Sequence, residues 1–197
     1  KDFKRASPEM VDKFSIGYAT PKFKDLFIKG IENQISEKNL IAAGLVNKTA
    51  KGTFDFFNDR TIFPIFDHNS KILGFGGRDE NWVKGKSKGP KYLNTKETTL
   101  FKKLEALFGI HLAKKHIIEK KSANIVEGYY DVIAMHQSNL ENTVASSGTA
   151  FTEDQAKLLK KWCKHLKLVF DGDKAGINAA KKAIEMVTPL GFSVDVV

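Results

Sequence analysis

The sequence predicts an α/β fold in which a parallel sheet flanked by helices follows a mixed α+β basic subdomain. Two short apolar runs, at 124–126 and 168–170, stop at acidic residues and glycine, and an amphipathic helical pattern follows each at once. Strand-like runs at 143–145 and 192–197 complete an alternating β–α order. This order builds a parallel sheet with right-handed crossovers. From about Arg60 the apolar residues follow the two-residue period of a β-strand. We therefore expect the part of the chain before the parallel sheet to have a different architecture.

The formal charge of +9 over 197 residues is unevenly distributed. Residues 1–50 carry an excess of +3, residues 51–120 an excess of +6, and residues 121–197 none. We therefore divide the chain into a basic α+β subdomain at 1–121 and a sheet domain at 122–197. A basic part joined to a neutral part with clustered acids is typical of an enzyme that grips a polyanion with one part and performs metal chemistry with the other.

The composition excludes several classes of site. A single cysteine, Cys163, rules out an internal disulfide and makes a cysteine-based zinc site unexpected, and the five histidines form no ligand pair at helical spacing. No apolar run is long enough to span a bilayer and no signal peptide opens the chain, so we expect a cytosolic protein without a membrane partner. The chain begins without methionine and stops inside a strand-like run, so we expect a fragment.

The first fifty residues predict three short helices. Ser7 is a suitable N-cap and Pro8 a suitable first helical residue. The helical patterns cover 7–14, 23–31 and 36–43, and Gly44 ends the last of them. After a turn at 51–53 comes an aromatic cluster at 54–57, for which packing is favoured over base stacking.

Two strand-like runs, 61–67 and 72–78, predict a β-hairpin. Glycines at 74, 76 and 77 resemble a nucleotide-binding fingerprint, but no crossover helix follows, so a dinucleotide site is not favoured. A backbone without side chains does permit close approach by another backbone or by a phosphate. In either case Arg78 would lie at the end of the strand and face the backbone or the phosphate that approaches the glycines.

A flexible basic loop at 81–90 follows, and then Lys91, Tyr92 and Asn94. A phosphate-seeking charge, an aromatic face and an amide together suit a nucleotide site better than a bare run of charges. A helix is then predicted from Thr98 to about Lys115.

Glu127, Asp171 and Asp173 come directly after predicted parallel strands. Ligands of open α/β sheets bind at the carboxyl edge of the strands, so these carboxylates are expected to converge there. Three such groups would repel one another unless a cation lay among them, and magnesium is the natural candidate. The alternative is that the acids only cap turns. Asp-Gly also favours hairpins, but helix formers follow Gly172, with Ile177, Ala180, Ile184 and Val187 on one face.

The segments Glu127-Gly128-Tyr129-Tyr130-Asp131 and Asp171-Gly172-Asp173 resemble the two signature motifs of a TOPRIM domain, the fold shared by primases, type IA and II topoisomerases and some nucleases. Further stretches resemble the catalytic core of bacterial DnaG-type primases over nearly the whole chain. These are Phe63-Pro64-Ile65, Gly74-Phe75-Gly76-Gly77-Arg78, Pro90-Lys91-Tyr92-Leu93-Asn94, Glu97-Thr98, Val144-Ala145-Ser146 and Asp171-Gly172-Asp173-Lys174-Ala175-Gly176.

The resemblance implies a TOPRIM-type sheet, truncated at its C-terminal end, and an enzyme that makes short RNA primers by metal-dependent nucleotidyl transfer. Glu127, Asp171 and Asp173 would be catalytic and metal-binding, with Asp131 as a supporting acid. The nucleotide or template would be bound by Arg78, Lys91, Tyr92, Asn94 and Lys103, and Arg60 and Arg5 match further basic positions of the family. The implied cofactor is Mg²⁺, with Mn²⁺ as a substitute and no zinc in this fragment.

The implied partners are single-stranded DNA template, ribonucleoside triphosphates and an RNA–DNA hybrid product. A replicative helicase would bind through a domain absent here, and the implied location is the bacterial cytoplasm, at the nucleoid. Two departures from the family pattern matter. Phe56 and Asn58 stand where relatives often carry arginine, and a further acidic motif is expected after the last strand. The rival functions are a TOPRIM nuclease or topoisomerase and a non-catalytic nucleic-acid-binding module.

Overall fold

The computed structural model describes residues 6–87, 89–146 and 148–197. They form two compact units. One, here called the hairpin unit, comprises Val11–Pro64 and Leu73–Lys102. The other, the parallel-sheet unit, comprises 6–10, Ile65–Ile72 and Lys103–Val197. Across these described ranges, no helix combines the length and apolarity needed to cross a bilayer.

A four-stranded sheet in the order β1-β4-β5-β6 organises the hairpin unit. Strands β4 (Arg60–Phe66) and β5 (Ile72–Arg78) are the predicted hairpin, which is confirmed. The outer strands β1 (Gly17–Ala19) and β6 (Tyr92–Asn94) have three residues each and pair antiparallel with β4 and β5. Strands this short leave too little alternation for a sequence pattern to reveal them.

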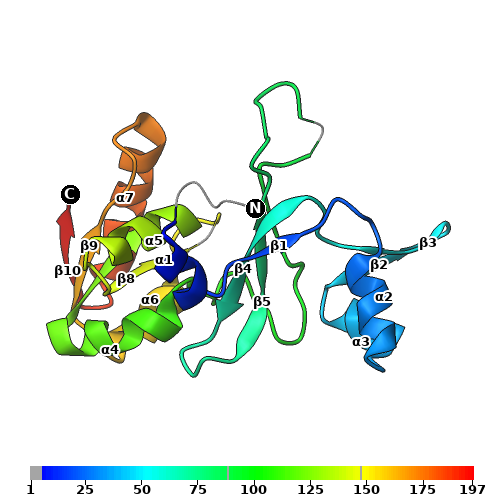
Figure 1. Cartoon of the computed structure of the whole chain (residues 1–197). Helices are drawn as coiled ribbons and strands as arrows, with labels where there is room; N and C mark the ends of the chain where they lie inside the picture. Colours follow the sequence, from blue (N-terminus) through cyan, green and yellow to red (C-terminus); the bar gives the residue numbers. More distant parts are fainter. Residues whose placement is uncertain (1–5, 88, 147) are drawn as a thin grey trace. The chain divides into compact units, whose positions relative to one another are not determined.

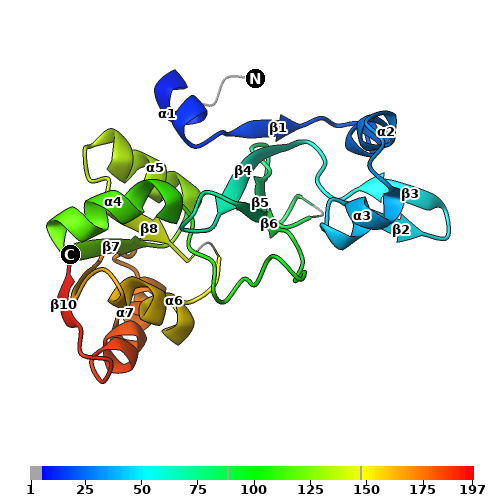
Figure 2. The ribbon, with the colours of Figure 1, turned by 90° about the horizontal axis from the view of Figure 1, so that it is seen from below.

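The hairpin of β2 (Val46–Thr49) and β3 (Gly52–Asp55) packs with helices α2 (Asp25–Glu32) and α3 (Glu37–Ala42), as Figure 2 shows. The Ser36 hydroxyl accepts the N–H of Asn39 and caps α3, whose predicted pattern covered 36–43. Helix α1 (Pro8–Lys13) likewise begins after Ser7, whose hydroxyl accepts the N–H of Met10 at 3.3 Å. The three predicted helices are therefore confirmed, with ends that differ by one or two residues.

The parallel-sheet unit contains strands in the order β10-β9-β7-β8, all parallel, and Figure 1 shows helices around this sheet. The strands are β7 (Ser122–Val126), β8 (Thr143–Ala145), β9 (His165–Leu168) and β10 (Ser193–Val196). The helices are α4 (Ile110–Lys120), α5 (Tyr129–Gln137), α6 (Glu153–Lys160) and α7 (Lys174–Val187). The predicted α/β class with a parallel sheet is confirmed.

The core of this unit joins α4, α6 and α7 to the sheet, and its fully buried members include Ile117, Ile125, Val144, Leu159, Leu166 and Val187. Thr152 and Gln155 form a capping box at the start of α6. One detail of α7 is wrong: Ile177 is 49% exposed, and Ala183 is buried in its place. The buried face of α7 consists of small residues, which allow close packing on the sheet.

The helix predicted from Thr98 to Lys115 is wrong in its first part and correct from Ile110 onward. Residues 98–109 are irregular, and α4 begins only at Ile110, after Gly109 with φ 82°. The backbone of Phe108 instead exchanges two hydrogen bonds with Ala145, of 2.8 and 3.2 Å. Leu107 and Phe108 are about 1% exposed, so the apolar spacing there reflects tertiary burial rather than a helical face.

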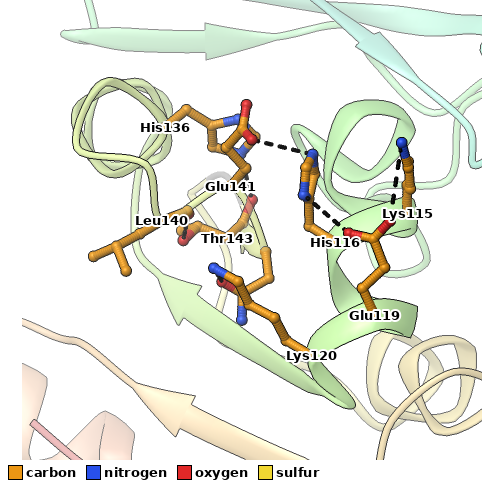
Figure 3. A network of polar contacts seen from close by, with 9 residues as sticks. Lys115, His116, Glu119, Lys120, His136, Leu140, Glu141 and Thr143 are labelled. Carbon is orange, nitrogen blue, oxygen red and sulfur yellow. Dashed lines mark hydrogen bonds and ion pairs between the residues drawn. The ribbon is translucent and has the colours of Figure 1, made fainter.

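His116 ties α4 to the segment that precedes β8 (Figure 3). Its Nδ1 lies 3.6 Å from Glu119 and its Nε2 lies 3.2 Å from Glu141, while Lys115 lies 3.9 Å from the same Glu119. These charges are partly exposed, so each pair contributes little to stability alone.

We expect His111 to make stability fall in mild acid. Burial, and next the charge of His136, lower the pKa of His111 to about 4. In the unfolded chain the pKa is roughly 6.5, so the neutral ring stabilises the fold fully above pH 6.5, and this contribution is lost as the pH falls toward 4. Allowing for partial solvent access, the loss should be about 1 kcal/mol. Urea unfolding of the wild type and His111→Leu at pH 7 and pH 4.5 measures it.

The variant should lose less stability than the wild type over that interval. Subtracting the change in unfolding free energy of the variant from that of the wild type cancels the contribution of other titrating groups. It also cancels any constant loss of packing against Phe66, whose ring centre lies 4.2 Å from that of His111. Equal losses in both proteins would show that His111 is not responsible.

Candidate metal and nucleotide sites

Glu127 and Asp171 meet at the carboxyl edge of the parallel sheet. Strands β7 and β9 are neighbours, and a hydrogen bond of 2.9 Å from the Val169 N–H to the Ile125 carbonyl extends their pairing. Beyond this point the Glu127 carboxylate accepts the backbone N–H of Asp171, with Oε1 at 3.2 Å. Both acidic side chains are exposed. The two motifs, far apart in the sequence, therefore face one another across adjacent strand ends.

Asp173 and Asp131 act locally as helix caps. The Oδ1 of Asp173 accepts the N–H of Gly176 at 2.8 Å and caps α7, while the Oδ2 of Asp131 accepts the N–H of Gly128 at 2.9 Å at the start of α5. A carboxylate at a helix N-terminus satisfies orphan donors and interacts favourably with the helix dipole. These contacts give both acids a structural role beside any chemical one.

The donor chemistry of this edge fits a divalent cation, because exposed carboxylate oxygens are the ligands such ions prefer. Each backbone hydrogen bond above occupies one carboxylate oxygen, and a carboxylate has two. Within the ranges that the structure describes, however, no three acidic, histidine or cysteine side chains are gathered closely enough to hold an ion. Glu127 and Asp171 are brought together, whereas Asp173 is turned to its helix cap.

Gly176 allows the acidic loop to fold back on its helix. A Cβ built on this residue would lie 2.0 Å from the backbone oxygen of Asp171, closer than two nonbonded atoms approach. By contrast, a Cβ on Gly172 would have no heavy atom within 4 Å. The glycine in the Asp171–Gly176 segment that the geometry requires is therefore the one inside α7.

In the hairpin unit, Arg78 and Tyr92 form one group on paired strands. They are partners in the β5–β6 register, and Nη1 of Arg78 donates to the Tyr92 hydroxyl at 2.8 Å. Arg78 is only 6% exposed and its Nε lies 3.2 Å from a Glu80 oxygen. Tyr92 is 37% exposed. The arginine is thus held rigidly, and the tyrosine ring is the more accessible of the two.

Arg60 is a clamp on the backbone. Its Nη1 donates to the Lys91 carbonyl at 3.2 Å and its Nη2 to the Pro90 carbonyl at 2.9 Å. The pKa of its guanidinium is lowered, and burial is the largest cause. The space for this side chain comes from Gly77, where a Cβ would lie 2.6 Å from the Phe57 ring and 3.1 Å from Arg60. Gly77, one of the glycines expected to permit close approach by another backbone or a phosphate, leaves room here for an aromatic ring and an arginine.

Lys91 is exposed beside two aromatic rings. Its Nζ lies 5.7 Å from the centre of the Tyr92 ring and 5.9 Å from that of Trp82. Trp82 also donates from Nε1 to the Gly89 carbonyl at 3.0 Å, which closes the basic loop on itself. The loop therefore carries an internal tie, although its composition predicted flexibility. Asn94 lies on β6 opposite Gly76.

Sequence reasoning missed two supporting residues here. One is Trp82, and the other is Thr95, which is buried and exchanges hydrogen bonds with the backbone of Phe75 at 2.9 and 3.2 Å. Neither belongs to a motif that would have drawn attention to it. Of the remaining predicted residues, Lys103 lies in a turn of the other unit, and Arg5 lies outside the described residues.

Two family models match the chain in succession. Residues 3–114 match the DNA primase catalytic core, N-terminal domain, and residues 124–197 match a Toprim-like domain. The first match alone covers more than half of the chain. The chain belongs to the DNA primase catalytic core family.

Individual relatives agree with this assignment. The DNA primases of Clostridium acetobutylicum and Aquifex aeolicus are each 40% identical, over 94% and 95% of this chain. The chain spans only 30% and 36% of their lengths. Among solved structures, the Aquifex aeolicus primase (zinc-binding and RNA polymerase domains) is 38% identical, with a TM-score of 0.87 over 98% of this chain and 46% of that one. The E. coli primase catalytic core is 35% identical, with a TM-score of 0.85 over 98% and 62%.

Proposed function

We propose that this chain is the catalytic core of a bacterial DNA primase and joins ribonucleotides into short RNA primers on single-stranded DNA. The observation that carries the proposal is the meeting of Glu127 with the Asp171 loop at the edge of a Toprim-like sheet, in a chain of the primase core family. Open α/β sheets bind ligands at this edge. The enzyme class that follows is a DNA-directed nucleotidyltransferase, with RNA–DNA hybrid as product.

In this reaction a 3′-hydroxyl attacks the α-phosphate of a ribonucleoside triphosphate and pyrophosphate leaves. Glu127, Asp171 and Asp173 would hold a divalent cation, Mg²⁺ or in its place Mn²⁺, which when bound neutralises charge that develops on the phosphate oxygens. The protein itself binds and orients. Lys91 offers an exposed ammonium to the triphosphate or template, and Tyr92 a ring face for a base.

The proposed template is supported by a solved relative. A DnaG primase catalytic domain bound to ssDNA is 35% identical, with a TM-score of 0.85 over 98% of this chain and 60% of that one. By the same likeness we propose a cytoplasmic location with the chromosome, and a replicative helicase as a partner of the longer protein. Arg60 would act on nucleic acid indirectly, by positioning Lys91 and Tyr92.

Lys91→Ala should weaken binding of single-stranded DNA. Removal of one phosphate contact lowers the slope of log affinity against log salt by about 0.7, and at low salt this costs several-fold in affinity. Fluorescence anisotropy with an oligonucleotide at several salt concentrations gives the slope. Lys38→Ala, which removes another exposed lysine, on α3, is the matched control and should leave the slope unchanged. Equal effects of both variants would show that only net charge matters.

The function itself is tested by incubating the protein with single-stranded template, labelled ribonucleotides and a divalent cation. We expect oligoribonucleotides that require template and metal. Cleavage of the DNA without synthesis would instead support a Toprim nuclease or topoisomerase. DNA binding without turnover, repeated with the longer protein, would favour the non-catalytic module in which Asp131 and Asp173 serve only as caps.

A further inference from the structure

A cavity lies within the hairpin unit, and none of the residues predicted to bind metal, nucleotide or template lines it. Its volume is about 350 Å³, and β1, α2, the end of β3 and strands β4 and β5 line it. Its apolar wall includes Ala19, Leu26, Leu45, Phe57, Ile62 and Phe75. Leu26 is 42% exposed, which places it at the mouth, whereas Phe57 is 8% exposed and belongs to the interior. The cavity is thus open at α2 and closed by the sheet.

Four polar side chains that line the cavity, those of Tyr18, Thr20, Asp25 and Asp55, are used within the protein. Thr20 donates from its hydroxyl to Asp25 at 2.7 Å, and the Tyr18 hydroxyl donates to Asp59. The two oxygens of Asp55 accept the N–H groups of Leu26 and Phe27, each at 2.9 Å, and cap the start of α2. An incoming ligand therefore meets a mostly apolar surface, because these polar atoms already have partners.

Lys29 is the cation that lines this cavity. It lies one turn beyond Asp25 and Leu26 on α2, and it is exposed. Among the ion pairs found in the described ranges, none involves its ammonium; Asp25, four residues before it on α2, pairs instead with Lys22 at 3.8 Å. The lining also holds the carboxylates of Asp25 and Asp55, but these already accept hydrogen bonds from the protein. Lys29 is therefore the charged group left to meet an apolar body that carries one negative charge.

We propose that this cavity binds a small aromatic carboxylic acid, with its rings against the apolar wall and its carboxylate at Lys29. A cavity of about 150 Å³ accommodates a single benzene ring, so the present volume suits two fused rings. The volume also falls within the roughly 300–1,000 Å³ usual for small-molecule sites. The walls include residues of β4 and β5, the strands that carry Arg60 and Arg78. A bound ligand would therefore contact the two strands that position the proposed nucleotide-binding residues.

The probe for this site is 2-naphthoate, and 2-naphthylmethanol is its neutral counterpart. Calorimetric titration should show one saturable site for the carboxylate with a dissociation constant of about 0.1 mM. The alcohol should bind roughly ten-fold more weakly, since it lacks the charge that meets Lys29.

Two pairs of variants make the test specific. Lys29→Glu should weaken 2-naphthoate binding at least about ten-fold, whereas Lys38→Glu, the same charge change on α3, should change it less than about two-fold. Leu26→Trp should close the mouth and abolish binding, whereas Ile28→Trp, at a 50% exposed position of the same helix outside the cavity lining, should not. Thermal melting of each variant shows whether it folds. If Leu26→Trp does not fold, the comparison of Lys29→Glu with Lys38→Glu still tests the proposal.

Lack of saturable binding up to about 5 mM 2-naphthoate would overturn the proposal, as would equal weakening by Lys29→Glu and Lys38→Glu. Sedimentation velocity tests the other occupant, a second copy of the chain. A dimer that Leu26→Trp dissociates would show that a protein surface covers the cavity, and this too would overturn the assignment to a free small molecule.

Discussion

Asp171→Ala is expected to reduce primer synthesis by at least about 100-fold and to leave the fold intact. The Asp171 side chain is exposed, and the hydrogen bond that joins this loop to Glu127 uses the backbone N–H of Asp171, which alanine retains. The variant therefore removes a carboxylate without removing the contact that positions its neighbour. Initial rates of ribonucleotide incorporation and the melting temperature are the two readouts. Glu185→Ala, an exposed acid on α7, is the control and should behave as wild type.

Asp173 requires a different substitution, because its carboxylate also caps α7. Asparagine is as good an N-cap as aspartate but carries no charge. Asp173→Asn should therefore keep the melting temperature within a few degrees and still lose most of the activity. If Asp171→Ala and Asp173→Asn both retained full synthesis in the presence of magnesium, the role assigned to these carboxylates would be refuted.

Gly176→Ala should disrupt the acidic loop itself. The added methyl group would lie 2.0 Å from the Asp171 carbonyl oxygen, so either the loop or the first turn of α7 must move. Overpacking of this kind costs about 1–3 kcal/mol, and here the displaced atoms are backbone, which yields less readily than a side chain. We expect a clear drop in the urea midpoint together with near-complete loss of synthesis.

Gly172→Ala serves as the matched control, because the same methyl group would meet no heavy atom within 4 Å. It should leave the urea midpoint nearly unchanged. Wild-type stability and activity in Gly176→Ala would mean that the close approach of α7 to the Asp171 carbonyl is not a feature of the folded protein.

The sequence was most informative where local chemistry and tertiary packing agree. Ser7, Ser36 and the Thr152–Gln155 capping box are used as local rules predict, because a cap depends on atoms within four residues. The β4–β5 hairpin and the β–α order of the second half were also predictable, because their periods change sharply at turns.

Prediction failed where distant parts of the chain decide the structure. Phe108 pairs with Ala145, so its segment is extended and buried although its apolar spacing indicated a helix. The three-residue strands β1 and β6 exist because β4 and β5 offer them edges. The local pattern of apolar residues contains no information about such pairing partners.

In the candidate sites, too, some features could be predicted from the sequence and others depend on the folded structure. That Glu127 and Asp171 would share a sheet edge follows from the parallel order alone. That Asp173 caps α7, or that Arg60 grips the backbone of Pro90 and Lys91, depends on side-chain geometry that residue type does not specify. Arg60 stands in a basic segment, which indicated a ligand for nucleic acid, and the structure adds two hydrogen bonds from its guanidinium to backbone carbonyls.

The central claim is that Glu127 and Asp171, with Asp173, hold a divalent cation at this sheet edge. The most direct measurement is anomalous diffraction from crystals soaked in manganese. The account predicts a peak about 2.2 Å from carboxylate oxygens of Glu127 and Asp171, with the Asp173 side chain turned toward it, and no such peak in Asp171→Ala. A manganese peak elsewhere, or none at this edge at concentrations that support synthesis, would contradict it.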